Sequence, residues 1–285
     1  MNQSDYYILF AHEHIHNWLG GKILLNDEEE ELSYWWTEGF TDYYSRVLAL
    51  RSGGITIDQF VSECNQLLRN YYLSPVINKS NADIKKSFWK DDNIQKLPYY
   101  RGFVFAIYLN GLIKLDNDNK SLDNIMLDLF KSPGQKEFSA EIFKKISKNY
   151  IPHGIAKEFS EYIDKGKTID LSSIMTILPI EKVQIGAYDP GFNRESLLEE
   201  NIIKNISTKS NAYKSGLRNG DKVIKWSLPK GHYPDQIITI VTKNKTFRYR
   251  PEHPNKKEVY QFKNNLSFKD KMKIRKFFGD NTLAE

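Results

Sequence analysis

Two histidines and a glutamate near the start of the chain have the spacing of a metal-dependent hydrolytic site. His12, Glu13 and His16 form an H-E-x-x-H run. On a helix the two histidines stand four residues apart on one face, so both imidazoles can reach one metal ion while the glutamate acts as a general base. His14 lies two positions from each histidine, points to another face and is not expected to be a ligand. So short a run also arises by chance, and a third ligand is needed to distinguish a zinc site from an unrelated pair.

Glu38 is the expected third ligand. It stands in an aromatic stretch, between Trp36 and Phe40, on a second helix that returns antiparallel to the first after a short loop. The alternative is an exposed acid at a helix start, but a glutamate among bulky rings needs a partner when it is buried. Two histidines and one glutamate leave a fourth zinc position for water, as a hydrolytic site requires.

Two polar residues after Glu38 are weaker candidates for supporting roles. Asp42 lies one turn beyond Glu38, and Thr41 precedes it. Either side chain could hold a ligating imidazole in place by a hydrogen bond. A capping or surface role fits both residues equally well.

The elements that must position these residues are mostly helices in the first part of the chain. Apolar periodicity, turn residues and caps predict helices over residues 5–19, 35–51, 56–72, 83–88, 98–115, 121–131, 139–148 and 155–165. Short strands are expected at 183–187, 202–206, 222–226, 236–242 and 246–249. The prediction is an α+β fold with a helical region over 1–175, a β-rich domain over 181–268 and a basic tail over 269–285 that starts as an amphipathic helix.

Composition narrows the class of protein. The chain has 285 residues, 40% of them hydrophobic and 27% charged, which is typical of a globular protein. The formal net charge of +5 comes without a concentrated basic face, so nucleic acid is not an expected partner. Cys64 is the only cysteine and excludes an intrachain disulfide. Neither a membrane span nor a signal peptide is recognisable, so we expect a cytoplasmic protein, or a periplasmic one if the chain is part of a longer precursor.

The region around these residues resembles a known family of zinc peptidases. The H-E-x-x-H run followed by W-x-E-G-F-T-x-Y-Y at residues 36–44 resembles the gluzincins, and the stretch WWTEGFTDYYSRVLALRSGGIT at 35–56 is most similar to the M61 glycyl aminopeptidases. The segment from Pro98 to Gly102 resembles the part of these families that carries a catalytic tyrosine. The spacing to the glycine selects Tyr99, with Tyr100 as the second choice.

This resemblance implies a zinc-dependent aminopeptidase. One Zn²⁺ on His12, His16 and Glu38 would activate water and polarise the scissile carbonyl. Glu13 would act as the general base, and Tyr99 would stabilise the oxyanion. The implied substrates are peptides, including those with small N-terminal residues such as Gly or Ala.

A second resemblance concerns the β-rich part. Residues 212–224 resemble the S-x-A-x-x-x-G-L-x-x-G-D-x-I segment of PDZ domains, which also follow the catalytic unit in M61 proteins. Such domains add a peptide as an extra strand at a sheet edge. A PDZ-like unit that only supports the helical region is equally compatible with these residues.

The resemblance also implies a β-rich region before the first helix, which the sequence does not contain. Two expectations follow. The chain is a zinc peptidase that acts with a partner chain or as part of a longer gene product, or it is a catalytically incomplete remnant that works as a PDZ-like binding module.

Overall fold

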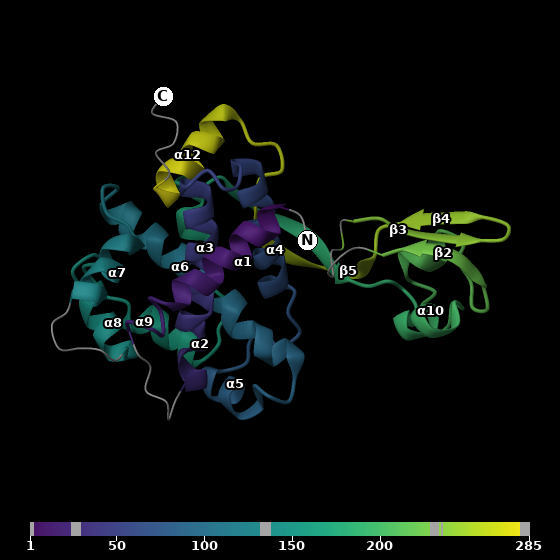
Figure 1. Ribbon diagram of the computed structural model, residues 1–285, viewed down its shortest axis with the longest axis horizontal. Coiled ribbons are helices and arrows are strands. Elements are labelled where there is room, and N and C mark those ends of the chain that lie inside the picture. The colour runs from purple at the N-terminus through teal and green to yellow at the C-terminus, as the bar shows by residue number, and fades with distance from the viewer. Residues whose placement is uncertain (1–2, 24–29, 132–137, 229–233, 235, 280–285) are drawn as a thin grey trace. The chain divides into compact units, whose positions relative to one another are not determined.

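The computed structural model describes residues 3–23, 30–131, 138–228, 234 and 236–279, and divides into two compact units. The first unit comprises Met1–Glu181 and Tyr260–Glu285, and the second comprises Lys182–Val259. The first unit is largely helical and the second contains a small antiparallel sheet (Figure 1). The predicted α+β fold class is therefore confirmed.

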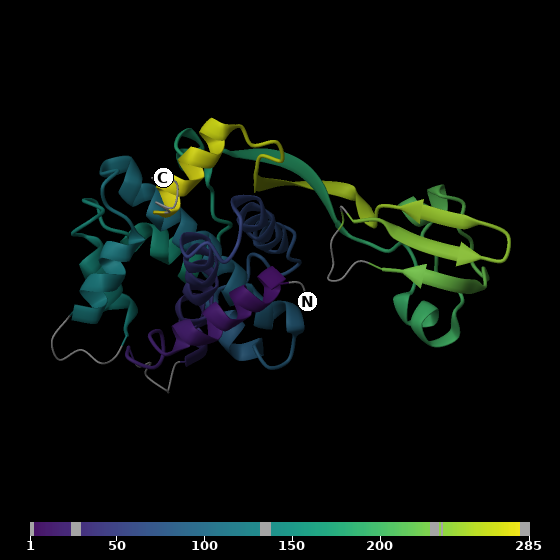
Figure 2. The same ribbon diagram turned by 45° about the horizontal axis from the view of Figure 1, so that its top comes forward.

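The helices of the first unit gather around α3 and α6, as Figures 1 and 2 show. In chain order they are α1 (Gln3–His16), α2 (Glu30–Thr37), α3 (Gly39–Arg51), α4 (Ile57–Tyr72), α5 (Asn81–Ser87), α6 (Asp92–Asp116), α7 (Leu122–Lys131), α8 (Ala140–Ser147) and α9 (Ala156–Phe159). A π-helical turn (Ser160–Asp164) and a 3₁₀ turn (Ser172–Thr176) follow, and α12 (Phe268–Phe278) closes the unit. Each helix predicted from the sequence has a counterpart.

The central helix α6 is longer than the sequence predicted. It begins at Asp92, six residues before Pro98, because the Asp91 side chain caps it by accepting from the backbone N–H groups of Asn93 and Ile94. Its residues from Phe103 to Leu109 are all buried. A helix that is apolar on every side must lie inside the protein, which explains why so many helices contact it.

The second predicted helix, over 35–51, is interrupted at Glu38 and forms α2 and α3 instead. At this point the chain crosses α6 backbone to backbone, at Gly39 and Gly102. A Cβ atom added to Gly102 would lie 1.8 Å from the Trp35 carbonyl oxygen and 2.7 Å from the Gly39 Cα. Only glycine fits this crossing. Glu30 and Glu31 begin α2.

The second unit contains the antiparallel sheet β2 (Val223–Ser227), β3 (Ile238–Thr242) and β4 (Thr246–Tyr249), in the order β2-β3-β4, with α10 (Arg194–Glu200) and α11 (Asn211–Lys214). Figure 2 shows the three strands side by side. Their buried faces share one core, which is made of Phe192, Leu197, Ile203, Ala212, Leu217, Val223, Ile238, Ile240, Phe247 and Tyr249.

One predicted strand is absent, and one observed strand was not predicted. Residues 202–206 form no strand, only a bridge from Ile202 to Lys222, because Asn201 and Asn205 both take a left-handed conformation with φ 54°. The sequence also missed β5 (Glu252–Phe262), which pairs with β1 (Ile180–Tyr188). Its first half is polar and exposed, so it lacks the apolar alternation that marks a strand.

The C-terminal boundary differs from the predicted division at 268 and 269. Residues from Tyr260 onward belong to the first unit. Phe277 and Phe278 of α12 are buried, and the Phe278 ring lies 4.8 Å from that of Phe60 on α4. The predicted amphipathic helix is present, and its apolar face is part of the first core.

None of the helices in the described ranges is long and apolar enough to cross a membrane.

Candidate metal centre

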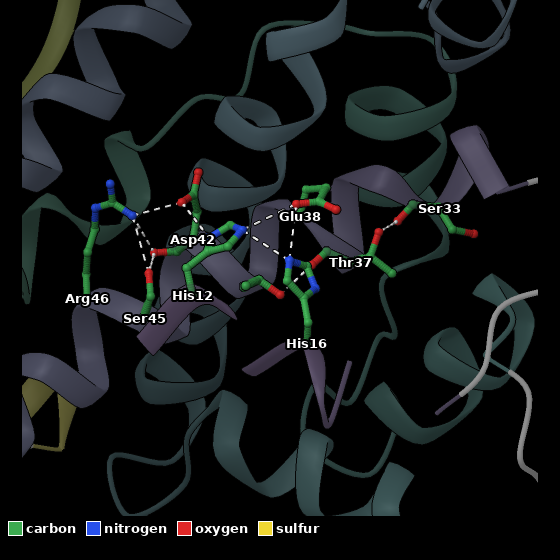
Figure 3. Close-up of polar contacts among 9 residues, drawn as sticks. His12, His16, Ser33, Thr37, Glu38, Asp42, Ser45 and Arg46 are labelled. Carbon is green, nitrogen blue, oxygen red and sulfur yellow. Dashed lines mark hydrogen bonds and ion pairs between the residues drawn. The ribbon is translucent and has the colours of Figure 1, made fainter. Parts of the chain in front are cut away.

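Three side chains from α1 and from the α2–α3 junction converge at one point (Figure 3). Nε2 of His12 and Nε2 of His16 each lie 3.5 Å from Oε2 of Glu38. The two imidazole nitrogens are 3.1 Å apart. All three side chains are half-buried.

Local helix geometry explains this convergence. α1 packs against α3, and its Ile8 and Ile15 are buried. His12 and His16 lie one turn apart on this helix. Glu38 occupies the break between α2 and α3, so its side chain faces α1 where the chain changes helix.

In the metal-free centre, the pKa of each ionisable side chain depends on the charges of its neighbours. Burial lowers the pKa of His12, but its contacts with Asp42 and Glu38 outweigh this effect and raise it from 6.5 to about 9. Burial raises the pKa of Glu38, yet the two histidines lower it to about 2. The contact with Glu38 also raises the pKa of His16. Without a metal, the Glu38 carboxylate is therefore ionised and the His12 imidazole is protonated at neutral pH.

Asp42 and Thr41 differ in what they contact. Oδ1 of Asp42 lies 3.3 Å from Nδ1 of His12, on the side of the ring opposite Glu38 (Figure 3). This contact fixes which nitrogen of His12 carries a proton and leaves Nε2 free to bind a metal. Thr41 is buried, and its hydroxyl donates to the Thr37 carbonyl oxygen instead of to either histidine.

The three other residues of the run, Glu13, His14 and Ile15, are not among the converging side chains. Glu13 is exposed on α1, next to the two histidines. His14 is also exposed and lines a separate, largely apolar cavity of about 430 Å³ between α1, α3 and α7. It is not part of the described cluster that could hold a metal ion.

The two candidate tyrosines face different partners. Tyr99 is half-buried, and burial together with the neighbouring Glu38 carboxylate raises the pKa of its phenol. Burial also raises the pKa of Tyr100, whose hydrogen-bond partner is instead Asn70. Tyr99 is thus the tyrosine whose hydroxyl adjoins Glu38.

Arg46 belongs to the same network but was not identified from the sequence. Its Nη1 donates to Oδ1 of Asp42 at 2.9 Å (Figure 3). The available signal was its position four residues after Asp42, the helical spacing at which an acid and a base meet.

The donor set fits a zinc ion. Two imidazole nitrogens and one carboxylate oxygen lie within 4.8 Å of one another, and two histidines with one glutamate make a known hydrolytic zinc set with one open position. Asp42 supplies the carboxylate partner that a ligating histidine normally has on its second nitrogen.

Comparison with known proteins identifies a family model that matches part of the chain. Residues 5–113, which contain His12, Glu13, His16, Glu38 and Tyr99, match the model of the M61 glycyl aminopeptidase family. No curated protein matches the chain.

The fold is similar to that of a solved structure, an aminopeptidase N family protein from Idiomarina loihiensis, with a TM-score of 0.59 and 16% sequence identity. The match covers 96% of this chain and 55% of that one, so the chain spans about half the length of that protein. At this identity, the likeness is one of fold.

Proposed function

We propose that this protein is a zinc-dependent peptidase of the M61 aminopeptidase type. The observation that supports this most strongly is the convergence of His12, His16 and Glu38, within a segment that matches the M61 family model. The three side chains would hold one Zn²⁺. Bound there, the ion would supply Lewis-acid activation of water and of the scissile carbonyl.

The remaining steps belong to side chains of the chain itself. Glu13, on the same helix as both histidines and open to solvent, takes the proton from the attacking water and passes it to the leaving amine. Tyr99 is protonated at neutral pH, as an ordinary phenol is, and its surroundings raise its pKa further. It can therefore donate a hydrogen bond to the oxyanion that forms at the substrate carbonyl.

Amide substrates with a free N-terminal Gly or Ala test this proposal. We expect zinc-dependent hydrolysis by the native protein and a drop of about 10²-fold or more in kcat for Glu13→Gln, because the general base is removed. Tyr99→Phe should lower kcat while KM stays close to native, because the oxyanion exists only in the transition state. Tyr100→Phe is the matched control and should retain activity.

A second candidate function is that of a metal-binding but non-hydrolytic unit, with the second unit as a PDZ-like binding module. Phe10 is 69% exposed and Tyr6 is 50% exposed on the helix that carries Glu13, which favours a binding role for this helix. Exposed apolar residues of this kind often mark a surface that another polypeptide covers. Zinc binding without hydrolysis, unchanged by Glu13→Gln, would favour this candidate over the peptidase.

A further inference from the structure

Arg46 lies one turn beyond Asp42 on α3 and is buried, with 8% of its surface exposed. Its Nη1 donates to Oδ1 of Asp42 at 2.9 Å and to the Asp42 carbonyl oxygen at 3.0 Å. Its Nη2 lies 3.6 Å from Oε2 of Glu63 on α4. Groups of alternating charge therefore run from the His12 imidazole through Asp42 and Arg46 to Glu63.

The same oxygen of Asp42 serves both neighbours. Oδ1 faces Nδ1 of His12 on one side and Nη1 of Arg46 on the other (Figure 3). A buried carboxylate is stable only when it is paired. Without Arg46, Asp42 would lose the donor that fixes its rotamer, and the orientation of the His12 ring would no longer be determined.

We propose that Arg46 is a positioning residue for metal binding. It fixes the Asp42 carboxylate, which in turn orients His12 so that Nε2 faces Glu38 and His16. Glu63 orients the far side of the guanidinium. This inference rests on the proposed function, because it requires that His12 bind a metal.

The chain offers a matched control in Arg51. This arginine lies on the same helix and is also partly buried, and its Nη2 pairs with Oδ2 of Asp123 at 2.8 Å. It also donates from Nε to the Phe278 carbonyl oxygen. Removing it deletes a comparable ion pair without touching Asp42 or His12.

The test is the zinc affinity of the full chain, measured by competition with a chromophoric chelator, alongside the unfolding midpoint of the metal-free protein. For Arg46→Met we expect zinc binding about 10- to 100-fold weaker than native, the usual effect of losing a residue that orients a ligand. Arg46→Lys keeps one donor for Oδ1 of Asp42 and should fall in between. Arg51→Met should bind zinc as tightly as native, although it too lowers the unfolding midpoint.

A second measurement reports the geometry of the metal site and does not depend on catalytic activity. The visible absorption spectrum of the Co²⁺-loaded protein should change in Arg46→Met and not in Arg51→Met. If Arg46→Met does not fold, the zinc affinities of Arg46→Lys and Glu63→Gln are compared with that of the native protein instead. Both variants should bind zinc more weakly than native.

The outcomes separate this inference from the proposed function. Native zinc affinity in Arg46→Met overturns the role of Arg46 and leaves the zinc site intact. Equal weakening in Arg46→Met and Arg51→Met also overturns it, because the cause is then general destabilisation. A native chain that binds no zinc contradicts the proposed function itself.

Discussion

The two nitrogens of His12 have different tasks in this centre. Nδ1 faces Asp42 and Nε2 faces Glu38, so the ring is held between two carboxylates. In the metal-free protein both contacts favour the protonated ring. A metal ion must displace that proton, which couples occupancy of the site to pH.

This coupling gives the metal-free protein a defined pH dependence of stability. The pKa of His12 is raised from 6.5 to about 9 on folding, so its contribution is fully present below 6.5 and is lost as the pH rises through 9. The pKa of Glu38 falls from 4.5 to about 2, so its contribution is present above 4.5 and is lost as the pH falls through 2. With excess chelator, we therefore expect the urea midpoint to fall between pH 6.5 and 9.

Variants at two neighbouring histidines test whether His12 causes this fall of the urea midpoint with pH. His12→Gln should flatten it, because the group that titrates is gone. His14 is exposed and is not a member of the cluster, so His14→Asn should keep the native trend. A native urea midpoint that stays constant from pH 6.5 to 9 would contradict the charge assignment.

At the scale of elements, the crossing of α2 and α3 over α6 places Glu38 beside Tyr99. Gly39 and Gly102 let the two backbones touch. Glu38 directly precedes Gly39, and Tyr99 lies three residues before Gly102. The positions of His12, Glu13 and His16 then follow from the packing of α1 against α3. The centre is thus built from helix contacts and not from loops, which favours a fixed geometry.

A methyl group at this crossing should separate the helices. In Gly102→Ala the new Cβ would lie 1.8 Å from the Trp35 carbonyl oxygen, which the neighbouring backbone cannot accommodate without moving. We expect a loss of about 1–3 kcal/mol or more in unfolding free energy, and a lower kcat because Tyr99 moves from Glu38. Urea unfolding and steady-state kinetics measure the two effects.

Gly54→Ala is the matched control for that substitution. Its added Cβ would meet no atom closer than 3.4 Å, an ordinary contact, so stability and kcat should stay near native. If Gly102→Ala behaves like Gly54→Ala, the crossing does not set the geometry of the centre.

What the sequence could predict here depends on how local each feature is. The His12–His16 pair could be predicted because any helix places residues four positions apart on the same face. The break at Glu38 was missed because it is set by a contact with Gly102, far along the chain. The choice between Tyr99 and Tyr100 depends on the rotation of α6 about its axis, which burial pattern alone does not give for a helix that is apolar all round.

At the scale of the whole molecule, the first unit is discontinuous in sequence. The chain leaves it at Glu181 and returns at Tyr260. The return is secured by Asn65 on α4, which donates to the Phe262 carbonyl oxygen at 3.1 Å and accepts from the Phe262 N–H at 2.7 Å. Sequence alone could not show this, because a side chain that bonds the backbone some 200 residues away leaves no periodic signal.

Truncation tests how much the first unit depends on that return. A chain ending at Val259 loses α12, including the buried Phe277 and Phe278, and its Asn65 side chain loses its partners. Because each buried Phe contributes about 3–5 kcal/mol, we expect loss of the cooperative thermal transition of the first unit. A chain ending at Gly279 removes only residues beyond α12 and should melt like native. A cooperative transition near the native temperature in the shorter chain would contradict this dependence.

The central claim is that His12, His16 and Glu38 hold a zinc ion, and elemental analysis after dialysis tests it most directly. We expect about one zinc per chain for the native protein, as for a site with three protein ligands. His14→Ala and Glu13→Gln should retain the metal, whereas His12→Ala and Glu38→Ala should lose it. A native chain without zinc, or one whose zinc content survives His12→Ala and Glu38→Ala, would contradict the account.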